Sequence, residues 1–362
     1  MRLAEISVPK MNPFNGTGCG TADGLRFCSA AEAVKEAVES RLRPLFVADG
    51  GTYGVFMPPK TPRAVTMVLD TEDALALFSA PDDIGCVVAA GGPSVLRAAR
   101  AFAAIRRANC YLLPAEATFD GAFEREGEVT FGGERAVMPL AEGKVFADET
   151  LLNPTLARAF ARILLARLAL FEQRSLCALL KRERSPLYEE AFALCTRPER
   201  LSVREILKRS AILRNMENEG LFIGEGVVLA RQEPESEDVP EWRAFSELSA
   251  LYAAFFRWGK PRRYAVPDYA RRAAAAGVSY AEISVPAREE YAMRAVALER
   301  ARGELLREIG AITAKKAEYR RILRAFGGRD SGRTSAEQLF RLPELCPKGL
   351  SAVVRDFGLM EK

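Results

Sequence analysis

The chain has 362 residues, of which 49% are hydrophobic and 28% are charged, and its formal net charge is +4. This composition is that of a globular protein, and so small a net charge argues against a nucleic-acid-binding protein. The chain contains no histidine, which excludes a Ser-His-Asp triad, a Cys-His pair and any metal site that uses imidazole.

The first part of the chain alternates short apolar runs with helical patterns. Helices are predicted over residues 94–107, with apolar residues on one face and four arginines on the other, and over 71–79, where Asp70 or Thr71 is the expected N-cap. Strands that alternate with helices and are apolar throughout are typical of a parallel sheet covered on both faces. Four runs are predicted to be such strands: residues 44–48, 64–69, 84–89 and 109–113.

From Pro154 onward the apolar residues recur at helical spacing. In the basic run 294–324, arginines alternate with glutamates, which is typical of a solvated helix face. We therefore predict an α/β domain over residues 1–154 and an all-helical domain over 155–362, with a cleft between them. Five helical segments are expected: residues 155–182, 185–194, 202–216, 241–258 and about 286–324.

A glycine-rich turn, Gly91-Gly92-Pro93-Ser94, joins the third predicted strand to a helix. Backbone N–H groups and a helix N-terminus at such a turn can bind a phosphate. Pro93 removes one N–H from that site, but proline is also favoured at the first position of any helix. The turn by itself is therefore compatible with a phosphate site and with a plain connection.

The loop at residues 114–121 follows the fourth predicted strand and contains Thr118 and Asp120. Ligands of α/β proteins bind beyond the carboxyl ends of parallel strands, which makes these two residues candidates for ligand binding. Asp120-Gly121 is equally the sequence of a tight turn.

Several segments resemble the sn-glycerol-1-phosphate dehydrogenase family, within the iron-containing alcohol dehydrogenases and dehydroquinate synthases. The match begins near Cys19-Gly20, which is similar to a "CxCG" start, and ends in residues 351–361, similar to the family's last helix. Four segments between them resemble, in order, the "ADxNTY" turn, the "GGGSVxDxAK" cofactor turn, the "VPTAxSxDG" loop and the strand that closes the cofactor domain: residues 46–55, 90–100, 113–121 and 144–148.

This resemblance implies a dehydroquinate synthase-like fold, with a Rossmann-like domain that binds NAD or NADP and a helical domain that binds a divalent metal. In the family, one Asp and two His hold the metal. The corresponding positions here are Arg162-Ile163, residues 224–231 and residues 245–247, where only Glu247 matches. No metal ligand carries over. The cofactor turn also departs from the family pattern at Ala90, Pro93 and Arg97, and the next loop departs at Ala115.

The lost metal would act as a Lewis acid on the substrate oxygen. Arg162 and Arg231 stand near the lost ligand positions and could stabilise an oxyanion instead. We favour the alternative that they fill the vacated space or pair with Glu225 and Glu247. Those two carboxylates could also hold magnesium, but we expect them to be solvated.

The sequence has no pattern of a secreted or membrane protein. Its beginning includes Glu5 and Lys10 without a long apolar run, unlike a secretory signal. The longest apolar candidate, residues 163–171, is too short to span a bilayer and contains Arg167. Seven cysteines without zinc-ribbon or C-x-x-C spacing fit a cytoplasmic protein, with Cys86 and Cys110 in the core.

Three functions follow as hypotheses. The first is a degenerate glycerol-1-phosphate dehydrogenase-like protein without metal-dependent activity. The second is an active, metal-independent NAD(P) oxidoreductase that acts on a small phosphorylated or polyol substrate. The third is a non-catalytic scaffold or subunit whose helical half binds a partner. Under each hypothesis we expect no nucleic-acid or membrane partner, and a homo-oligomer is possible. The first retains weak binding of a dinucleotide or a phosphorylated small molecule at five residues: Gly91, Gly92, Ser94, Thr118 and Asp120. No catalytic residue is assigned.

Overall fold

The structure is a computed structural model. It describes residues 25–54, 63–69, 73–232, 239–258, 270, 273–274, 279, 287–329 and 336–357. Several positions used in the sequence analysis lie outside the described residues: Glu5, Lys10, Cys19-Gly20, Asp70, Thr71, residue 55 and residues 358–361.

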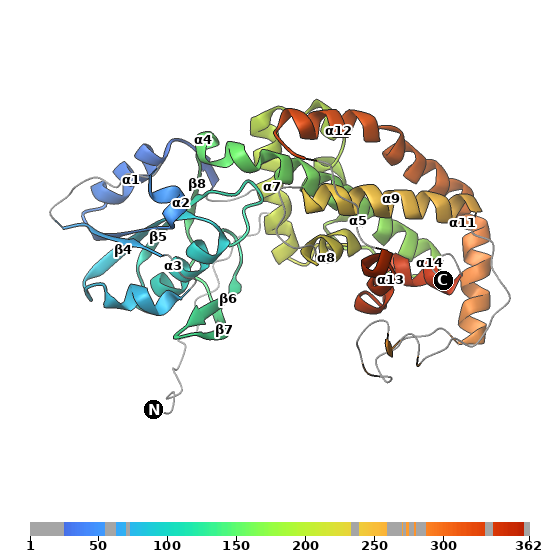
Figure 1. Ribbon diagram of the computed structural model, residues 1–362, viewed down its shortest axis with the longest axis horizontal. Coiled ribbons are helices and arrows are strands. Elements are labelled where there is room, and N and C mark those ends of the chain that lie inside the picture. The colour runs from blue at the N-terminus through green and yellow to red at the C-terminus, as the bar shows by residue number, and fades with distance from the viewer. Residues whose placement is uncertain are drawn as a thin grey trace.

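A parallel sheet of six strands forms the first part of the molecule (Figure 1), in the order β1-β8-β5-β4-β2-β3. All its pairings are parallel, which confirms the predicted class. The four predicted strands and the closing strand at residues 144–148 are present, whereas the three-residue β1 was not predicted. The strands are β1 (Leu25–Phe27), β2 (Arg43–Ala48), β3 (Val65–Val68), β4 (Ile84–Gly91), β5 (Asn109–Pro114) and β8 (Lys144–Ala147).

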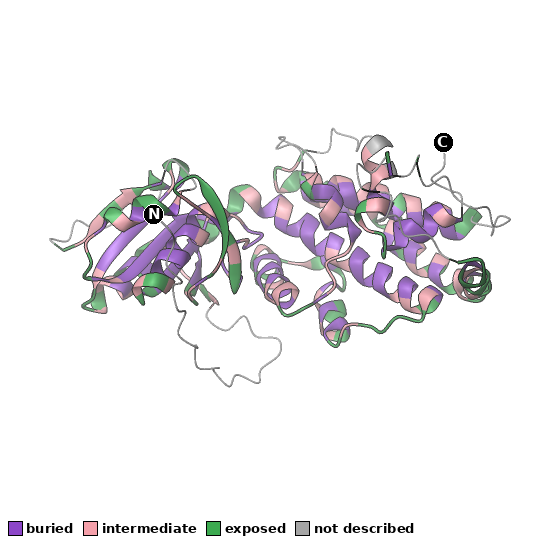
Figure 2. Ribbon diagram, turned by 90° about the horizontal axis from the view of Figure 1, so that it is seen from below, coloured by how far each residue is buried: buried purple, intermediate pink, exposed green. Residues whose placement is uncertain are grey.

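Helices cover both faces of this sheet, because successive strand residues point to opposite sides. Phe46 and Val88 face α1 (Ala30–Glu39) and belong to one buried cluster. Val47 and Val87 face α3 (Pro93–Arg106) and belong to the other. Figure 2 shows the buried strands lying between helices whose outer sides are exposed. Cys86 and Cys110 are buried, as predicted.

The prediction that four arginines share the solvent face of α3 is wrong for Arg100. This side chain is only 2% exposed. Its guanidinium donates to the carbonyl oxygens of Ala141 at 2.7 Å, Gly121 at 2.8 Å and Glu124 at 2.5 Å. Arg100 therefore ties α3 to the segment that follows β5, and its charge is buried among backbone dipoles.

The helix predicted over residues 71–79 is a short 3₁₀ helix, η1 (Ala74–Ser79), that begins at Asp73. The Asp73 carboxylate accepts from the Leu75 N–H at 2.9 Å, which caps η1, and from the Gly132 N–H at 2.9 Å. Gly132 belongs to a hairpin that was not predicted, formed by β6 (Glu126–Phe131) and β7 (Glu134–Pro139). The two turn residues, Gly132 and Gly133, have positive φ angles, as two-residue hairpin turns require.

The described residues after β8 are almost entirely helical, as predicted. Ser202 begins α7 with a capping box that includes Glu205. The seven-residue α8 was not predicted as a helix. The elements are α4 (Glu149–Leu152), η2 (Asn153–Thr155), α5 (Leu156–Leu180), α6 (Tyr188–Leu194), η3 (Pro198–Arg200), α7 (Val203–Asn218), α8 (Glu225–Arg231), α9 (Pro240–Trp258), α11 (Arg288–Ala314), α12 (Lys316–Ala325), α13 (Ala336–Leu345) and α14 (Leu350–Asp356).

One hydrophobic cluster extends from the sheet into the helices and includes Val47, Phe160 and Phe357. The division into domains at residues 1–154 and 155–362 therefore stays a prediction about units that share a continuous core. None of the described helices has the length and apolar character needed to cross a bilayer.

We predict that Arg100→Met lowers the free energy of unfolding by about 3 kcal/mol or more, because it leaves three buried carbonyl groups without donors. Urea unfolding measures this loss. The matched control is Arg107→Gly on the same helix, at an exposed residue whose φ is 55°. Glycine tolerates that angle better than arginine does, so the control should not be destabilised. A loss below about 1 kcal/mol for Arg100→Met would contradict the assigned role.

Candidate functional site

The carboxyl ends of β2, β4 and β5 bring three loops of the chain together. Ala48 pairs with Ala90, and Gly91 pairs with Pro114. Asp49, the Gly91-Gly92 turn and the loop at residues 114–121 therefore meet at one edge of the sheet. This is where α/β proteins bind ligands.

Asp49 occupies the glycine-rich turn with its own carboxylate. Its Oδ2 accepts from the Gly92 N–H at 3.1 Å. Its Oδ1 accepts from the Thr52 N–H at 2.6 Å and lies 2.7 Å from the Thr52 hydroxyl, which caps the short helix α2 (Gly50–Tyr53). The Gly92 N–H, which was predicted to bind a phosphate, is therefore engaged by an anion that belongs to the chain.

Two glycines permit this close packing. A β-carbon at position 91 would lie 2.5 Å from Asp49 Oδ2. At Gly121, where φ is +78°, a β-carbon would lie 2.8 Å from the Pro93 carbonyl oxygen. The Ala115 N–H donates to the Gly91 carbonyl at 2.9 Å, which fastens the two loops together. These glycines are needed for packing of the chain against itself.

Ser94 lines a pocket of about 210 Å³ between the start of α3 and the β6–β7 hairpin. Arg97, Thr130 and Arg135 also line it. The Arg97 guanidinium is bound on two nitrogens by Glu124, at 2.6 and 2.8 Å. The charge of Arg97, at the start of α3, is therefore already paired.

The 114–121 loop is clamped by the helical part of the chain. The Ala117 N–H donates to the Thr155 hydroxyl at 2.8 Å, and the Ser210 hydroxyl donates to the Ala117 carbonyl at 2.7 Å. Thr118 is 1% exposed, so a ligand could reach it only if the loop moved. The buried Phe119 has a φ of 56°, a strained angle for a bulky residue that these clamps help to hold.

Asp120 is part of an ion-pair network that joins this loop to α5 and α7. Its carboxylate lies 3.4 Å from Arg162 and 3.1 Å from Arg214. Glu217 pairs with the same two arginines, at 2.7 and 2.8 Å. Burial alone would lower the pKa of Arg162, but the charges of Glu217 and Asp120 outweigh it and raise the pKa.

The network continues through Glu124 to α3. Glu124 pairs with Arg214 and with Arg97, and it accepts from the Gly121 N–H at 3.2 Å. Burial alone would raise the pKa of Glu124, but Arg97 and Arg214 lower it to about 2. We call these six residues the arginine network: Arg97, Asp120, Glu124, Arg162, Arg214 and Glu217.

A second, smaller ion-pair group lies beside the glycine-rich turn. Arg158 is 3.4 Å from Glu116 and 3.1 Å from Glu241. Glu116 lies within 3.5 Å of the position of a β-carbon on Gly92. Burial raises the pKa of Glu116, and Arg158 opposes that effect. The turn is thus flanked by Asp49 and Glu116, both acidic, which disfavours a phosphate.

The predicted pairing of Arg162 and Arg231 with Glu225 and Glu247 was wrong. Arg162 pairs with Asp120 and Glu217, and Arg231 is exposed. Glu225, which we expected to be solvated, is 2% exposed. Its carboxylate bonds to Tyr252 and Ser351, far from Arg162 in the sequence.

The residues near Arg162 do not fit the metal that the resemblance implies. A buried guanidinium stands where a metal-binding carboxylate would be needed, and it already neutralises Asp120 and Glu217. Within the described part of the chain, no group of three or more Cys, Asp or Glu is placed to hold a metal ion.

The sequence analysis missed most of the residues that meet here. Asp49 had a usable signal, since it follows a predicted strand just as the two chosen loops do. Glu124, Arg214 and Glu217 had none, because nothing in a helical pattern indicates which charged residue faces a loop more than 90 positions away.

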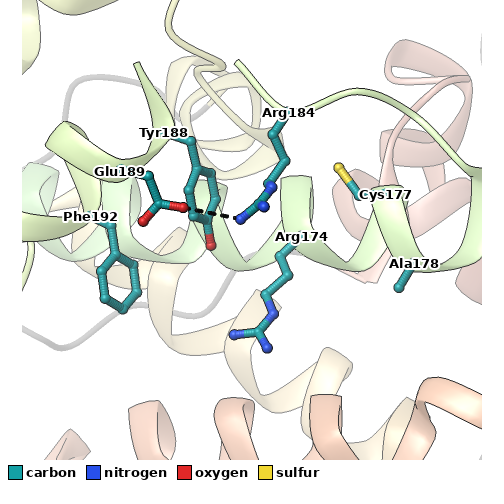
Figure 3. Close-up of a pocket in the computed structure, with 7 residues that line it drawn as sticks. All are labelled: Arg174, Cys177, Ala178, Arg184, Tyr188, Glu189 and Phe192. Atoms are coloured by element: carbon teal, nitrogen blue, oxygen red, sulfur yellow. Dashed lines mark hydrogen bonds and ion pairs between the residues drawn. The ribbon is translucent and has the colours of Figure 1, made fainter. Parts of the chain in front are cut away.

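A separate pocket of about 540 Å³ lies in the helical part, between α5 and α6 (Figure 3). The rings of Tyr188 and Phe192 stack at 6.2 Å, and the Arg184 guanidinium lies 5.1 Å from the Tyr188 ring centre. Arg184 also pairs with Glu189, and Arg174 pairs with Glu308 at 2.9 Å. The arginines that line this pocket therefore have partners in the chain.

We predict that Glu124→Gln lowers the free energy of unfolding by about 3 kcal/mol at pH 7. The reason is that the pKa of Glu124 falls from 4.5 to about 2 on folding. A lowered pKa stabilises the fold above pH 4.5, and this contribution is lost as the pH falls from 4.5 toward 2. Urea unfolding at pH 7 and at several lower pH values measures both effects.

The control is Glu128→Gln, which removes an exposed ion pair with Arg135. Such pairs contribute at most about 1 kcal/mol, so this variant should behave like the unchanged chain. Equal losses for the two variants, or a loss at Glu124 that does not depend on pH, would refute the role of the arginine network.

No protein-family model and no curated protein matches the chain. Solved structures similar to it include a maleylacetate reductase from Agrobacterium tumefaciens, with 16% identity, coverage of 96% of this chain and 97% of that one, and a TM-score of 0.49. A probable glycerol dehydrogenase from Sinorhizobium meliloti shows 13% identity, 92% and 95% coverage and a TM-score of 0.48. An iron-containing alcohol dehydrogenase from Corynebacterium glutamicum shows 13% identity, 93% coverage of each chain and a TM-score of 0.45.

Proposed function

We propose that this protein is a degenerate glycerol-1-phosphate dehydrogenase-like protein, which lacks metal-dependent dehydrogenase activity and binds a dinucleotide or a phosphorylated small molecule weakly. The observation that carries the proposal is the buried ion pair of Arg162 with Asp120 and Glu217. A guanidinium at this position repels a divalent cation. Removing it would leave two carboxylates without their shared partner.

The arginine network does not favour the alternative of a metal-independent oxidoreductase. An arginine that stabilises an oxyanion must direct free N–H groups at the substrate oxygen. Arg162 binds two carboxylates, and Arg214 binds three. Each guanidinium would have to give up such a pair before it could serve a substrate. Fold alone supports neither activity, because function depends on the site.

Weak ligand binding follows from the occupancy of the glycine-rich turn. A phosphate at the Gly92 N–H competes with the Asp49 carboxylate, which already accepts that hydrogen. Asp49 and Glu116 add two negative charges close by, although Arg158 offsets the second. The start of α3 and Ser94 still present a small pocket. We therefore propose Ser94, which lines this pocket, as the main contact. Gly91 and Gly92 in the turn, and Thr118 and Asp120 in the 114–121 loop, would reach a ligand only if their present contacts opened.

The first prediction from this proposal concerns metal. Protein purified without an affinity tag should contain no stoichiometric zinc, iron or nickel, and should not oxidise glycerol 1-phosphate or reduce dihydroxyacetone phosphate. Elemental analysis and a nicotinamide absorbance assay measure the two. One metal ion per chain that only a chelator removes, or turnover without added metal, would overturn the proposal.

The second prediction concerns the turn. Asp49→Asn removes the charge that competes for the Gly92 N–H, and should tighten binding of NADH or NADPH about tenfold in calorimetry. Gly92→Asp adds a carboxylate and should abolish binding. The matched control is Asp148→Asn, which alters a residue that also caps a helix at this sheet edge but bonds to Ala30 and Thr150. Equal affinities for Asp49→Asn and the unchanged chain would place the ligand elsewhere.

A further inference from the structure

Two glutamates and a tyrosine are buried together in the helical part, about ten residues along α5 from Arg162. Glu172 is 1% exposed, Glu225 is 2% exposed and Tyr252 is fully buried. The Tyr252 hydroxyl lies 3.0 Å from Glu172 Oε1 and 2.5 Å from Glu225 Oε2. The three residues come from α5, α8 and α9, which lie with α14 in the helical part of the molecule (Figure 1).

The hydrogen bonds favour one arrangement of protons. Tyr252 has a single hydroxyl hydrogen, so it donates to one carboxyl group and must accept from the other. Glu172 Oε2 accepts from the Glu225 N–H at 2.9 Å, so Glu172 Oε1 is left to carry a proton and donate it to Tyr252. Tyr252 in turn donates to Glu225.

Glu225 is the better placed of the two to hold the negative charge, because Ser351 and Tyr252 oppose the rise in its pKa that burial causes. Its carboxylate accepts from the Ser351 N–H at 2.9 Å, from the Ser351 hydroxyl at 2.6 Å and from Tyr252. Gly349 packs closely against the Glu225 carboxylate, and a β-carbon at position 349 would clash with Glu225 Oε1. These contacts attach the first turn of α14 to α8, and three donors of this kind stabilise a carboxylate.

Within the described parts of the chain, no positive charge is placed to compensate for a second anion in this cluster. Among the described residues, neither carboxyl group forms an ion pair with an arginine or a lysine. The other titratable group that faces the cluster is Cys346, between α13 and α14, whose pKa is raised to about 12 by burial and then by both glutamates. Burial, and then the charge of Glu225, raise the pKa of Glu172 well above its usual value.

We propose that Glu172, Tyr252 and Glu225 share one buried proton, and that this proton makes the contact between α14 and the helical bundle a pH-sensitive clasp. When the Glu172 O–H bond breaks, the proton passes to water and leaves two adjacent anions without a cation. Because water can solvate them only if the cluster opens, rising pH favours release of α14. The clasp does not depend on ligand binding at the sheet edge.

The direction of the pH dependence follows from linkage. In the closed state Glu172 holds its proton, whereas in the open state it loses that proton above its unperturbed pKa of 4.5. The equilibrium constant for opening should therefore rise about tenfold per pH unit from 4.5 up to the raised pKa of the closed state, and level off above it.

Hydrogen exchange of the full-length protein between pH 6 and pH 8 tests the clasp. After correction for intrinsic exchange, the opening constant of residues 350–356 should rise with pH, by about tenfold per unit until the pH reaches the raised pKa of the closed state. In Glu172→Gln that slope should vanish, because the amide keeps the bond to Tyr252 without a titrating proton. The control Glu308→Gln should keep the slope, since Glu308 has a pKa also raised by burial but pairs with Arg174 on another face.

Infrared spectroscopy tests the proton itself. At pH 7 the protein should show the C=O band of a protonated carboxyl group, and Glu172→Gln should remove it. A slope that persists in Glu172→Gln, a flat profile in the unchanged chain, or a missing carboxyl band would each overturn the proposal. Failure of Glu172→Gln to fold would also overturn it, since a neutral amide should replace a neutral acid there.

Discussion

The arrangement of the sheet edge depends on one constraint: the charge of Arg162 is buried and must be balanced. A buried guanidinium is tolerated only where carboxylates and hydrogen bonds replace its water. Asp120 from the loop after β5 and Glu217 from α7 provide that balance. Arg214 then shares both carboxylates and brings in Glu124, which in turn binds Arg97 on α3. A single connected set of ion pairs therefore holds the loop, α3, α5 and α7 together.

This constraint also explains why the residues of the glycine-rich turn face inward. Glu124 accepts from the Gly121 N–H, and Gly121 packs on Pro93 at the start of α3. The same loop bonds to Gly91 through Ala115. With the loop held from the helical side by Ser210 and Thr155, little room is left for a group between the loop and the turn. The arginine network and the packing at the glycine-rich turn thus belong to one connected structure.

Sequence periodicity was sufficient to predict elements whose secondary structure follows from their own residues. The strands β2, β4 and β5 are uninterrupted apolar runs, and α5 and α9 keep helical spacing along their length. Periodicity could not predict contacts between charged residues that are far apart in the sequence. Arg162 lies 42 positions from Asp120 and 55 from Glu217, and no local pattern pairs them. Glu225 looked like a solvated carboxylate for the same reason, since its partners lie on α5, α9 and α14. The β6–β7 hairpin is different, because Gly132-Gly133 between alternating strands is a local signal that was overlooked.

The chain buries carboxyl groups in two opposite ways, and together they shape its response to pH. Glu124 is surrounded by arginines, so its pKa is lowered to about 2 and its contribution to stability is complete only above pH 4.5. Glu172 is fully buried and has another carboxylate as its neighbour, so its pKa is raised and its contribution declines as the pH rises above 4.5. The sum of the two contributions to stability is therefore greatest near pH 4.5. Below that pH, the arginine network at the sheet is weakened. Above it, the contact of α14 with the helical bundle is weakened. A chain without histidine has no unperturbed side chain that titrates between these limits other than its thiols and its terminal amine. The proton that we propose at Glu172 would give this fold a response to pH near neutrality without an imidazole.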